Sequence, residues 1–209
     1  MTLFFFDFDK TLYAYNFRKR LPELSRLTGV SQYQLAKSWW AGGYEKRAES
    51  GEWRDPADYF AEFERVTGAH LTLEDYQSSR HLASTPIAGS VDALRHAATL
   101  GTVSLLSNNP SPFAASLPVL APDVCAVVGE NRLVSCDLGV RKPDPRAYRL
   151  ALERFGTSAE ETFFADDSAE NIAGAASIGI TGHQLTYLNG EPQVEALRAA
   201  IDAFAEARA

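Results

Sequence analysis

The chain opens with an uninterrupted apolar run that is followed by acidic residues at alternate positions. Residues 3–6 are one leucine and three phenylalanines, a pattern that predicts a buried strand. Asp7 and Asp9 follow that run directly. Carboxylates are rarely buried without a partner. Because open α/β sheets bind ligands at the carboxyl ends of their strands, we expect both carboxylates at that edge of a sheet.

From residue 16 to residue 84 the apolar positions follow a helical period, and no strand-like run appears. Helix-start signals recur, among them Pro22, Ser31 and Asp55, the last of which precedes a proline. The pattern predicts an all-helical segment inserted after the first strand. Its helices are expected over residues 22–29, 31–40, 44–50, 56–68 and 73–83.

Beyond residue 85 the pattern alternates between short apolar runs and amphipathic stretches. Helices are expected over residues 90–100, 111–117, 145–155, 169–178 and 191–207, and strands over 102–106, 124–128, 133–136, 162–165 and 180–185. Such alternation is typical of an α/β fold with a doubly wound parallel sheet. We therefore expect one core made of residues 1–15 and 85–209, with residues 16–84 as a helical cap.

Composition narrows the class of protein without naming an activity. The 209 residues are 45% hydrophobic and 22% charged, which fits one soluble domain with an insert. A formal net charge of -7 argues against nucleic acid or an anionic membrane as a partner. Cys125 and Cys136 form no C-x-x-C pair, which favours free thiols in a reducing compartment. With no signal-peptide or membrane-spanning pattern, we expect a cytoplasmic protein.

Polar side chains follow three of the expected strands. Ser107 and Asn108 end one, and Asp166 and Asp167 end another, in addition to the acids after the first strand. In a parallel sheet these strand ends share one edge. Clustered carboxylates repel one another, so a hard cation such as Mg²⁺ is expected among them. Lys142, in a loop that Pro143 and Pro145 stiffen, is a candidate cation for the same edge.

In this order the strand-end residues resemble the four motifs of the haloacid dehalogenase-like hydrolase superfamily, and the resemblance covers nearly the whole chain. The motifs correspond to residues 6–12, Ser107, Lys142 and residues 164–171. The resemblance implies a Rossmann-like core and hydrolysis of a small phosphomonoester through an aspartyl-phosphate. Thr11, within the first motif, would brace its loop.

Catalytic roles follow from the resemblance residue by residue. Asp7 would be the nucleophile, and Asp9 would protonate the leaving alcohol and then deprotonate water. Ser107, helped by the backbone around Asn108, would hold the transferring phosphoryl group. Lys142 would neutralise charge between Asp7 and that group. These roles suit phosphoryl transfer, which needs positioning and charge neutralisation.

The resemblance also implies a magnesium site. Asp167 would supply a carboxylate ligand, alongside Asp7 and the backbone carbonyl of Asp9. Asp166 would contact the residues that bind the metal ion, or would contact the ion through a water molecule. Asn171 stands where many relatives carry a further aspartate, so its contact with the metal stays open.

The helical insert resembles the small cap of the subfamily that includes sugar-phosphate phosphatases, and more narrowly glucose-1-phosphate phosphatase-like proteins. The narrower resemblance is carried by residues 51–53, residues 137–143 and the pair Asp166 and Asp167. Trp40, Gly43 and Tyr44 lie at a break between cap helices and are candidates for substrate choice, although most cap aromatics are expected to form the cap's own core.

Several functions remain open on this fold. Besides a Mg²⁺-dependent phosphatase they are a phosphomutase, a 2-haloacid dehalogenase and a non-catalytic binding protein. The expected partner is a small phosphorylated metabolite, and the chain would act as a monomer or homodimer.

Overall fold

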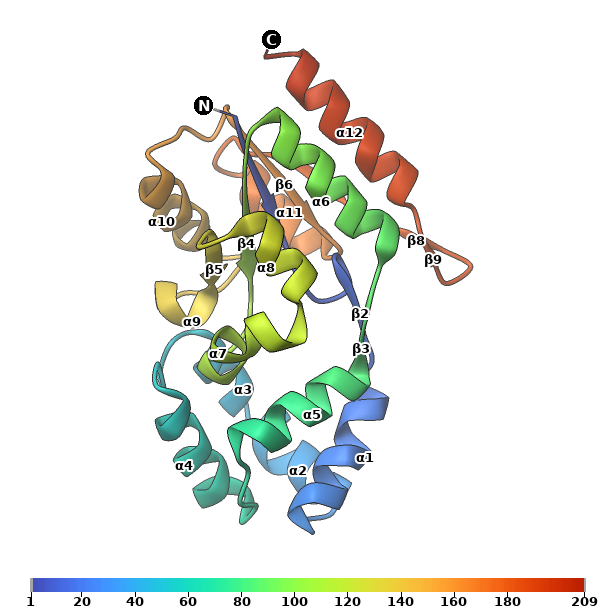
Figure 1. Cartoon of the computed structure of the whole chain (residues 1–209). Coiled ribbons are helices and arrows are strands. Elements are labelled where there is room, and N and C mark those ends of the chain that lie inside the picture. The colour runs from blue at the N-terminus through green and yellow to red at the C-terminus, as the bar shows by residue number, and fades with distance from the viewer. Residues whose placement is uncertain (1, 209) are drawn as a thin grey trace.

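A five-stranded parallel sheet forms the centre of the larger lobe (Figure 1). The computed structural model describes residues 2–208. The strand order is β5-β4-β1-β6-β7. The strands are β1 (Leu3–Phe6), β4 (Thr102–Ser107), β5 (Arg132–Val134), β6 (Thr162–Asp166) and β7 (Thr181–Gln184). The α/β fold with a doubly wound parallel sheet is therefore confirmed.

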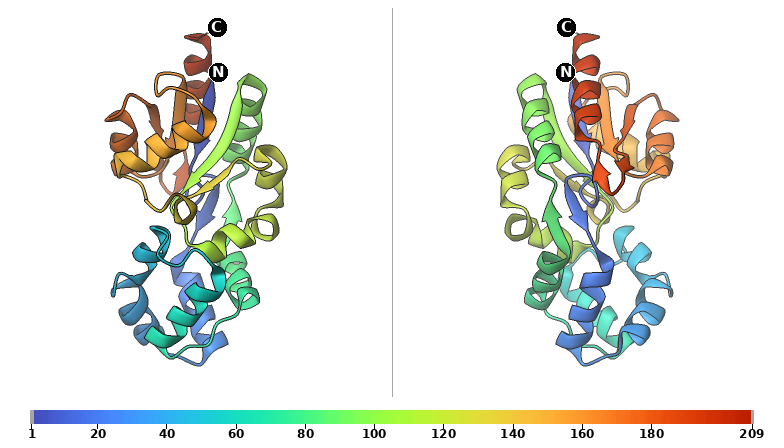
Figure 2. Two further views of the ribbon diagram at one scale, coloured as in Figure 1. Left: turned by 90° about the vertical axis from the view of Figure 1, so that its left-hand side faces the viewer. Right: turned by 90° about the vertical axis from the view of Figure 1, so that its right-hand side faces the viewer.

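Successive residues of the central strand β1 point to opposite faces of the sheet, and both faces are covered by helices. Phe4 and Phe6 belong to one buried cluster, and Leu3 and Phe5 to the other. Figure 2 shows the sheet between its two helical layers. The first face is covered by α6 (Ala88–Leu100), α8 (Pro122–Val128) and α12 (Val194–Glu206), and the second by α10 (Pro145–Phe155) and α11 (Ala169–Ala176).

The helical insert forms a second lobe beside the carboxyl ends of the strands (Figures 1 and 2). Side chains of Ser31, Asp55 and Thr72 cap three of its helices, the first two at positions that the sequence predicted. Trp39 is fully buried and packs against Tyr59, so cap aromatics form the lobe's own core. The helices are α1 (Phe17–Thr28), α2 (Gln32–Leu35), the π-helical turn Ala36–Trp40, α3 (Tyr44–Glu49), α4 (Pro56–Thr67) and α5 (Leu73–Ala83).

A short antiparallel ribbon joins the two lobes. Its strands are β2 (Tyr13–Tyr15) and β3 (Ser84–Pro86), which the sequence pattern did not reveal. Strands of three residues are too short to show a period. The ribbon lies where the sequence suggested that residues 16–84 separate from the core.

Three predicted elements need correction. Residues 124–128 were expected to form a strand but belong to α8, which begins with Pro122 in its first turn. The expected strand at 133–136 ends at Val134, and α9 (Ser135–Leu138) follows. The first cap helix begins at Phe17 rather than Pro22, because the Asn16 side chain accepts a hydrogen bond from the N–H of Arg18.

The end of the chain also differs from the prediction. Residues before the last helix form a hairpin of β8 (Tyr187–Leu188) and β9 (Glu191–Pro192), so that helix begins at Val194 rather than residue 191. No single helix within residues 2–208 is long and apolar enough to cross a membrane. The bent pair of α7 (Ser111–Leu120) and α8 meets that test by length and composition alone.

Candidate active site

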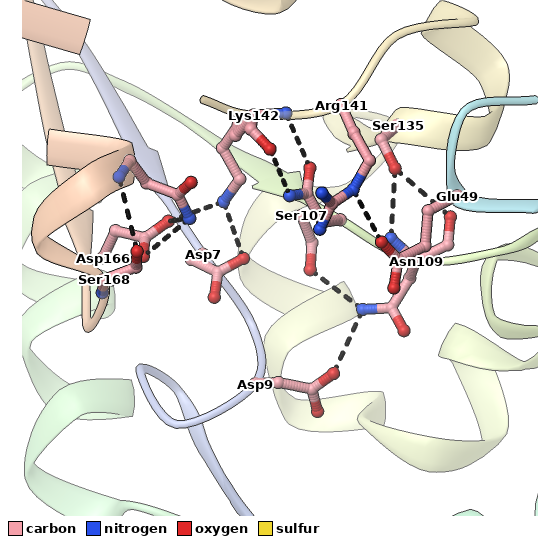
Figure 3. A network of polar contacts seen from close by, with 12 residues as sticks. Asp7, Asp9, Glu49, Ser107, Asn109, Ser135, Arg141, Lys142, Asp166 and Ser168 are labelled. Atoms are coloured by element: carbon pink, nitrogen blue, oxygen red, sulfur yellow. Dashed lines mark hydrogen bonds and ion pairs between the residues drawn. The ribbon is translucent and has the colours of Figure 1, made fainter. Parts of the chain in front are cut away.

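The polar strand ends meet at the carboxyl edge of the sheet, as predicted. Asp7 follows β1, Ser107 ends β4 and Asp166 ends β6, and neighbouring strands bring all three to the same edge. Lys142 enters from the loop before α10 (Figure 3). Parallel pairing of β4, β1 and β6 thus assembles residues that lie far apart in the sequence.

Lys142 bridges two of the carboxylates from a fully buried position. Its Nζ donates to Asp7 Oδ1 at 2.8 Å and to Asp166 Oδ2 at 2.7 Å. Burial on its own would lower the pKa of this ammonium, but the two carboxylates outweigh burial and raise it. Lys142 is therefore held in its charged form, against the ring of Phe164.

Asp7 is buried and keeps one oxygen free of the lysine. Burial raises the pKa of its carboxyl, Lys142 opposes the shift, and the nearby Asp166 carboxylate adds to it. Oδ1 accepts from Lys142, while no described residue donates a hydrogen bond to Oδ2. A further cation at this position would favour the ionised form, which leaves Oδ2 available as a nucleophile.

The loop that carries Lys142 is fixed from two sides. Asn108 donates from Nδ2 to the Lys142 carbonyl and accepts at Oδ1 from the Lys142 N–H, both at 2.9 Å. The backbone of α11 approaches the next residue so closely that a Cβ on Gly174 would lie 2.5 Å from the Pro143 carbonyl oxygen. The Lys142–Pro143 peptide is cis. The Asn108 side chain is therefore engaged with the main chain of Lys142.

Three carboxylates stand close enough to share a metal ion. Single oxygens of Asp7, Asp166 and Asp167 all lie within 4.8 Å of one another. Asp166 accepts hydrogen bonds from Lys142, Asn171 and the Ser168 N–H. These bonds engage both of its oxygens.

The carboxylate of Asp167 makes fewer hydrogen bonds than that of Asp166 and is therefore more available to a metal ion. It is half-buried, and no other described residue donates a hydrogen bond to its carboxylate, although Gln184 donates to its backbone carbonyl. Burial, followed by the nearby Asp166 charge, raises the pKa of Asp167. An all-oxygen set with crowded negative charge fits a hard divalent cation such as Mg²⁺.

Asp9 is held by a residue of the cap. Arg80, on α5, donates from Nη2 to Asp9 Oδ1 at 2.9 Å and to Oδ2 at 3.1 Å. Asn109 donates to Asp9 Oδ2 at 3.2 Å and to Ser107 Oγ at 3.0 Å. Ser107 and Asp9 are thus joined through a single amide (Figure 3).

The remaining predicted site residues lie apart from this network. The Thr11 hydroxyl is buried without a hydrogen-bond partner, while its N–H donates to the Phe8 carbonyl within the same loop. Trp40 packs on Phe17, and Tyr44 stacks within the aromatic core of the cap. Gly43 precedes α3 with a φ of 80°, a conformation that favours glycine.

Sequence reasoning missed three contributors to the site. Asn109 directly follows the two predicted residues of its strand end and carries the same amide group as Asn108. Arg80 lies on the buried face of α5, four residues after the buried Tyr76. A charged residue on that face was the available signal. Arg141 donates from Nε to Glu49 on α3 at 2.8 Å, a contact that no local pattern reports.

The family follows from a match that spans most of the chain. Residues 1–179 match the model of the haloacid dehalogenase-like hydrolases, so the chain belongs to that family and is a hydrolase. The strand-end motifs and the fold described above agree with this assignment.

Relatives of this chain include both phosphatases and a dehalogenase. A phosphatase of Mycobacterium tuberculosis is 25% identical over 85% of this chain and 84% of its own. An (S)-2-haloacid dehalogenase of Burkholderia cepacia is 27% identical over 78% of this chain and 71% of its own. A sesquiterpene phosphatase of Aspergillus oryzae is 46% identical over 48 residues, 23% of this chain and about a quarter of that protein.

Solved structures share the fold at low identity. An enzyme of this family from Bacteroides thetaiotaomicron, in complex with magnesium and inorganic phosphate, superposes with a TM-score of 0.73. It is 18% identical and covers 89% of this chain and 94% of its own. This likeness establishes the fold.

Proposed function

We propose that the protein is a Mg²⁺-dependent phosphatase that hydrolyses a small phosphomonoester through an aspartyl-phosphate on Asp7. The observation that carries the proposal is the carboxylate cluster of Asp7, Asp166 and Asp167 beside the buried ammonium of Lys142. Hydrolysis of a carbon–halogen bond needs a carboxylate nucleophile, but it needs neither a metal site nor an acid for an alkoxide leaving group.

In the first step Asp7 Oδ2 attacks phosphorus. The bond from phosphorus to the ester oxygen breaks, and Asp9 gives its proton to that oxygen, so that an alcohol leaves. Lys142 and Ser107 stabilise the charge on the transferring group. Arg80 and Asn109 hold the Asp9 carboxyl in place by the hydrogen bonds described above.

In the second step Asp9 takes a proton from water as the water oxygen attacks the phosphorus of the aspartyl-phosphate. The Asp7–phosphorus bond breaks, and inorganic phosphate is released. Asp7 regains its free carboxylate. Splitting the reaction in this way replaces one difficult displacement with two easier ones.

The metal ion would be held by the carboxylates of Asp7 and Asp167 and by the backbone carbonyl of Asp9. Asp166 would not bind the ion directly. When bound, Mg²⁺ supplies positive charge that stabilises the phosphoryl oxygens during transfer. Because Asp166 is already engaged by Lys142 and Asn171, its part is to orient the lysine.

The finer features of the protein belong to the same proposal. The substrate would be a sugar phosphate or a similar metabolite. The two free cysteines, Cys125 and Cys136, accord with a cytoplasmic location. The protein would be a monomer or a homodimer.

The direct test is release of inorganic phosphate from p-nitrophenyl phosphate and a panel of sugar phosphates, with Mg²⁺ or with EDTA. We expect release with Mg²⁺ and its loss in EDTA. Chloride release from 2-chloropropionate without phosphatase activity would favour a dehalogenase instead. Isomerised sugar phosphate without free phosphate would favour a phosphomutase, and no turnover of any compound a binding protein.

A further inference from the structure

Two buried arginines of the cap lie next to each other beyond Asp9. Arg80 contacts Asp9 and places its guanidinium 4.5 Å from the centre of the Tyr15 ring. Arg20, on α1, donates to the hydroxyl of the same tyrosine at 3.3 Å and lies 4.6 Å from the centre of the Tyr76 ring. Starting from Asp9, the order of contacts is therefore Arg80, Tyr15, Arg20 and Tyr76.

Arg20 is a buried charge that lacks a counterion. Its exposed fraction is 3%, and no carboxylate of residues 2–208 lies within 4 Å of its guanidinium. Among the described residues, the one hydrogen-bond acceptor of its guanidinium is the Tyr15 hydroxyl. Taking an ionised group out of water without an opposite charge is strongly unfavourable. Residues 2–208 thus supply no anion in contact with Arg20, and the Glu45 charge acts on the guanidinium only from beyond 4 Å.

Further unused hydrogen-bonding groups surround the same point. Within the part of the chain that the structure describes, Arg20 Nε, Arg80 Nε and the Tyr76 hydroxyl are buried and have no hydrogen-bond partner. Buried polar atoms normally have one. Three unpartnered groups, each able to donate, within one set of touching residues are what a site for an oxygen-rich group would present.

The nearby acids are already engaged. Glu45 accepts from the Trp39 indole at 2.6 Å and from the Tyr59 hydroxyl at 2.9 Å. Glu49 accepts from Arg141. Neither comes within 4 Å of Arg20, so neither forms an ion pair with it.

We infer that Arg20, with Arg80 and Tyr76, forms a subsite for a second anionic oxygen group on the leaving part of the substrate. The inference rests on the proposed phosphatase function, because it is Asp9 that faces the leaving oxygen. Lys142 and Ser107 serve the phosphoryl end, and Arg20 is joined to Asp9 through Tyr15 and Arg80. The group is a carboxylate or a second phosphoryl group, since both present oxygen anions to a guanidinium.

Matched pairs of esters test this subsite. In the first pair, 3-phosphoglycerate carries a carboxylate where glycerol 3-phosphate carries a neutral hydroxymethyl group. In the second, fructose 1,6-bisphosphate adds a phosphoryl group to fructose 6-phosphate. We expect kcat/KM to favour the anionic member of at least one pair, and the identity of that pair distinguishes a carboxylate from a phosphoryl group.

Replacement of Arg20 should remove that preference. For Arg20→Met we expect the ratio of kcat/KM within the preferred pair to fall roughly 10- to 100-fold, the range for hydrogen bonds to charged groups. Arg20→Lys, which keeps the charge, should retain part of it. The control is Arg26→Met on the same helix, because Arg26 is exposed and pairs with Glu23. Its ratio should match that of the wild type.

Thermal unfolding separates a subsite from a structural role. Since Arg20 lacks a counterion, Arg20→Met should unfold at or above the wild-type temperature, while the stabilisation by the preferred anionic ester should shrink. Equal losses for both members of each pair, or a wild type without preference for the anionic member, would overturn the subsite alone. No phosphate release from any ester, p-nitrophenyl phosphate included, would instead overturn the proposed function.

Discussion

Asn108 shows how a single amide positions the lysine of the site. Its side chain makes two hydrogen bonds to the Lys142 backbone. In Asn108→Ala both are lost, so the unfolding free energy should fall by about 1–3 kcal/mol and kcat by roughly 10- to 100-fold. Urea unfolding and phosphate release check the two effects. The control is Asn131→Ala, which removes one side-chain hydrogen bond to the Val103 carbonyl. It should lower the unfolding free energy and leave the rate of phosphate release unchanged.

The loss of activity on replacing Asp9 should depend on the leaving group of the substrate. Asp9→Asn cannot donate a proton to an alkoxide, so kcat/KM for alkyl phosphates should fall by roughly 10²- to 10⁴-fold. A p-nitrophenolate needs little protonation, and its release should fall much less. Steady-state rates on both substrates, with circular dichroism as a control for folding, measure the difference. Equal losses on the two would rule out Asp9 as the acid.

At the scale of elements, the site depends on close contact between α11 and the loop before α10. Ala in place of Gly in a helix normally stabilises it by about 0.5–1 kcal/mol. Gly174→Ala should instead destabilise by about 1–3 kcal/mol, because the new Cβ meets the Pro143 carbonyl oxygen at 2.5 Å. Activity should fall as Lys142 shifts. The exposed Ala173→Gly serves as the control on the same helix and should lower stability without loss of activity.

Strong local signals made much of the fold predictable. The apolar run of β1 and the start of α10 at Pro145, capped by Asp144, were both located correctly. The apolar residues of α8 were read as a strand, because five residues are too few to separate a strand from a buried helical turn. The hairpin of β8 and β9 has two-residue strands, which leave no period in the sequence.

At the site too, the residues that a local pattern marks could be predicted, and those placed by tertiary packing could not. Asp7, Ser107 and Asp166 could be predicted because each follows its strand, and parallel pairing brings strand ends together. Arg80 could not, because it contacts Asp9 only through the way in which the cap packs on the core, and Arg20 is joined to Arg80 only through Tyr15. Arg80 and Asp9 are 71 positions apart in the sequence, and no local pattern encodes their contact.

At the scale of the whole molecule, the ion pair of Glu49 and Arg141 joins the cap to the core. Burial and the nearby Glu45 charge raise the pKa of Glu49 to about 7. Arg141 opposes this shift, and the Asp9 charge adds to it. The folded protein therefore holds a proton that the unfolded chain releases near pH 4.5. The contribution of Glu49 to stability should fall as the pH rises from about 4.5 to 7.

Replacement by an amide tests this dependence. Glu49→Gln keeps an acceptor for Arg141 and cannot ionise, so its unfolding free energy should decline less than that of the wild type over this interval. Urea unfolding at pH 5 and pH 7 measures the difference. The exposed Glu153→Gln should follow the wild type. A decline as steep in Glu49→Gln as in the wild type would contradict the link.

The claim that the site is a phosphatase that depends on Asp7, and not a dehalogenase, is tested most directly by turnover of p-nitrophenyl phosphate in H₂¹⁸O with Mg²⁺, followed by mass spectrometry of the phosphate and of the peptide that contains Asp7. If water attacks phosphorus, each phosphate gains one ¹⁸O, the Asp7 carboxylate stays unlabelled, and Asp7→Asn or EDTA stops the reaction. Retained phosphate release in Asp7→Asn, or ¹⁸O in the Asp7 carboxylate during turnover of a 2-haloacid, would contradict a phosphatase that works through aspartyl-phosphate.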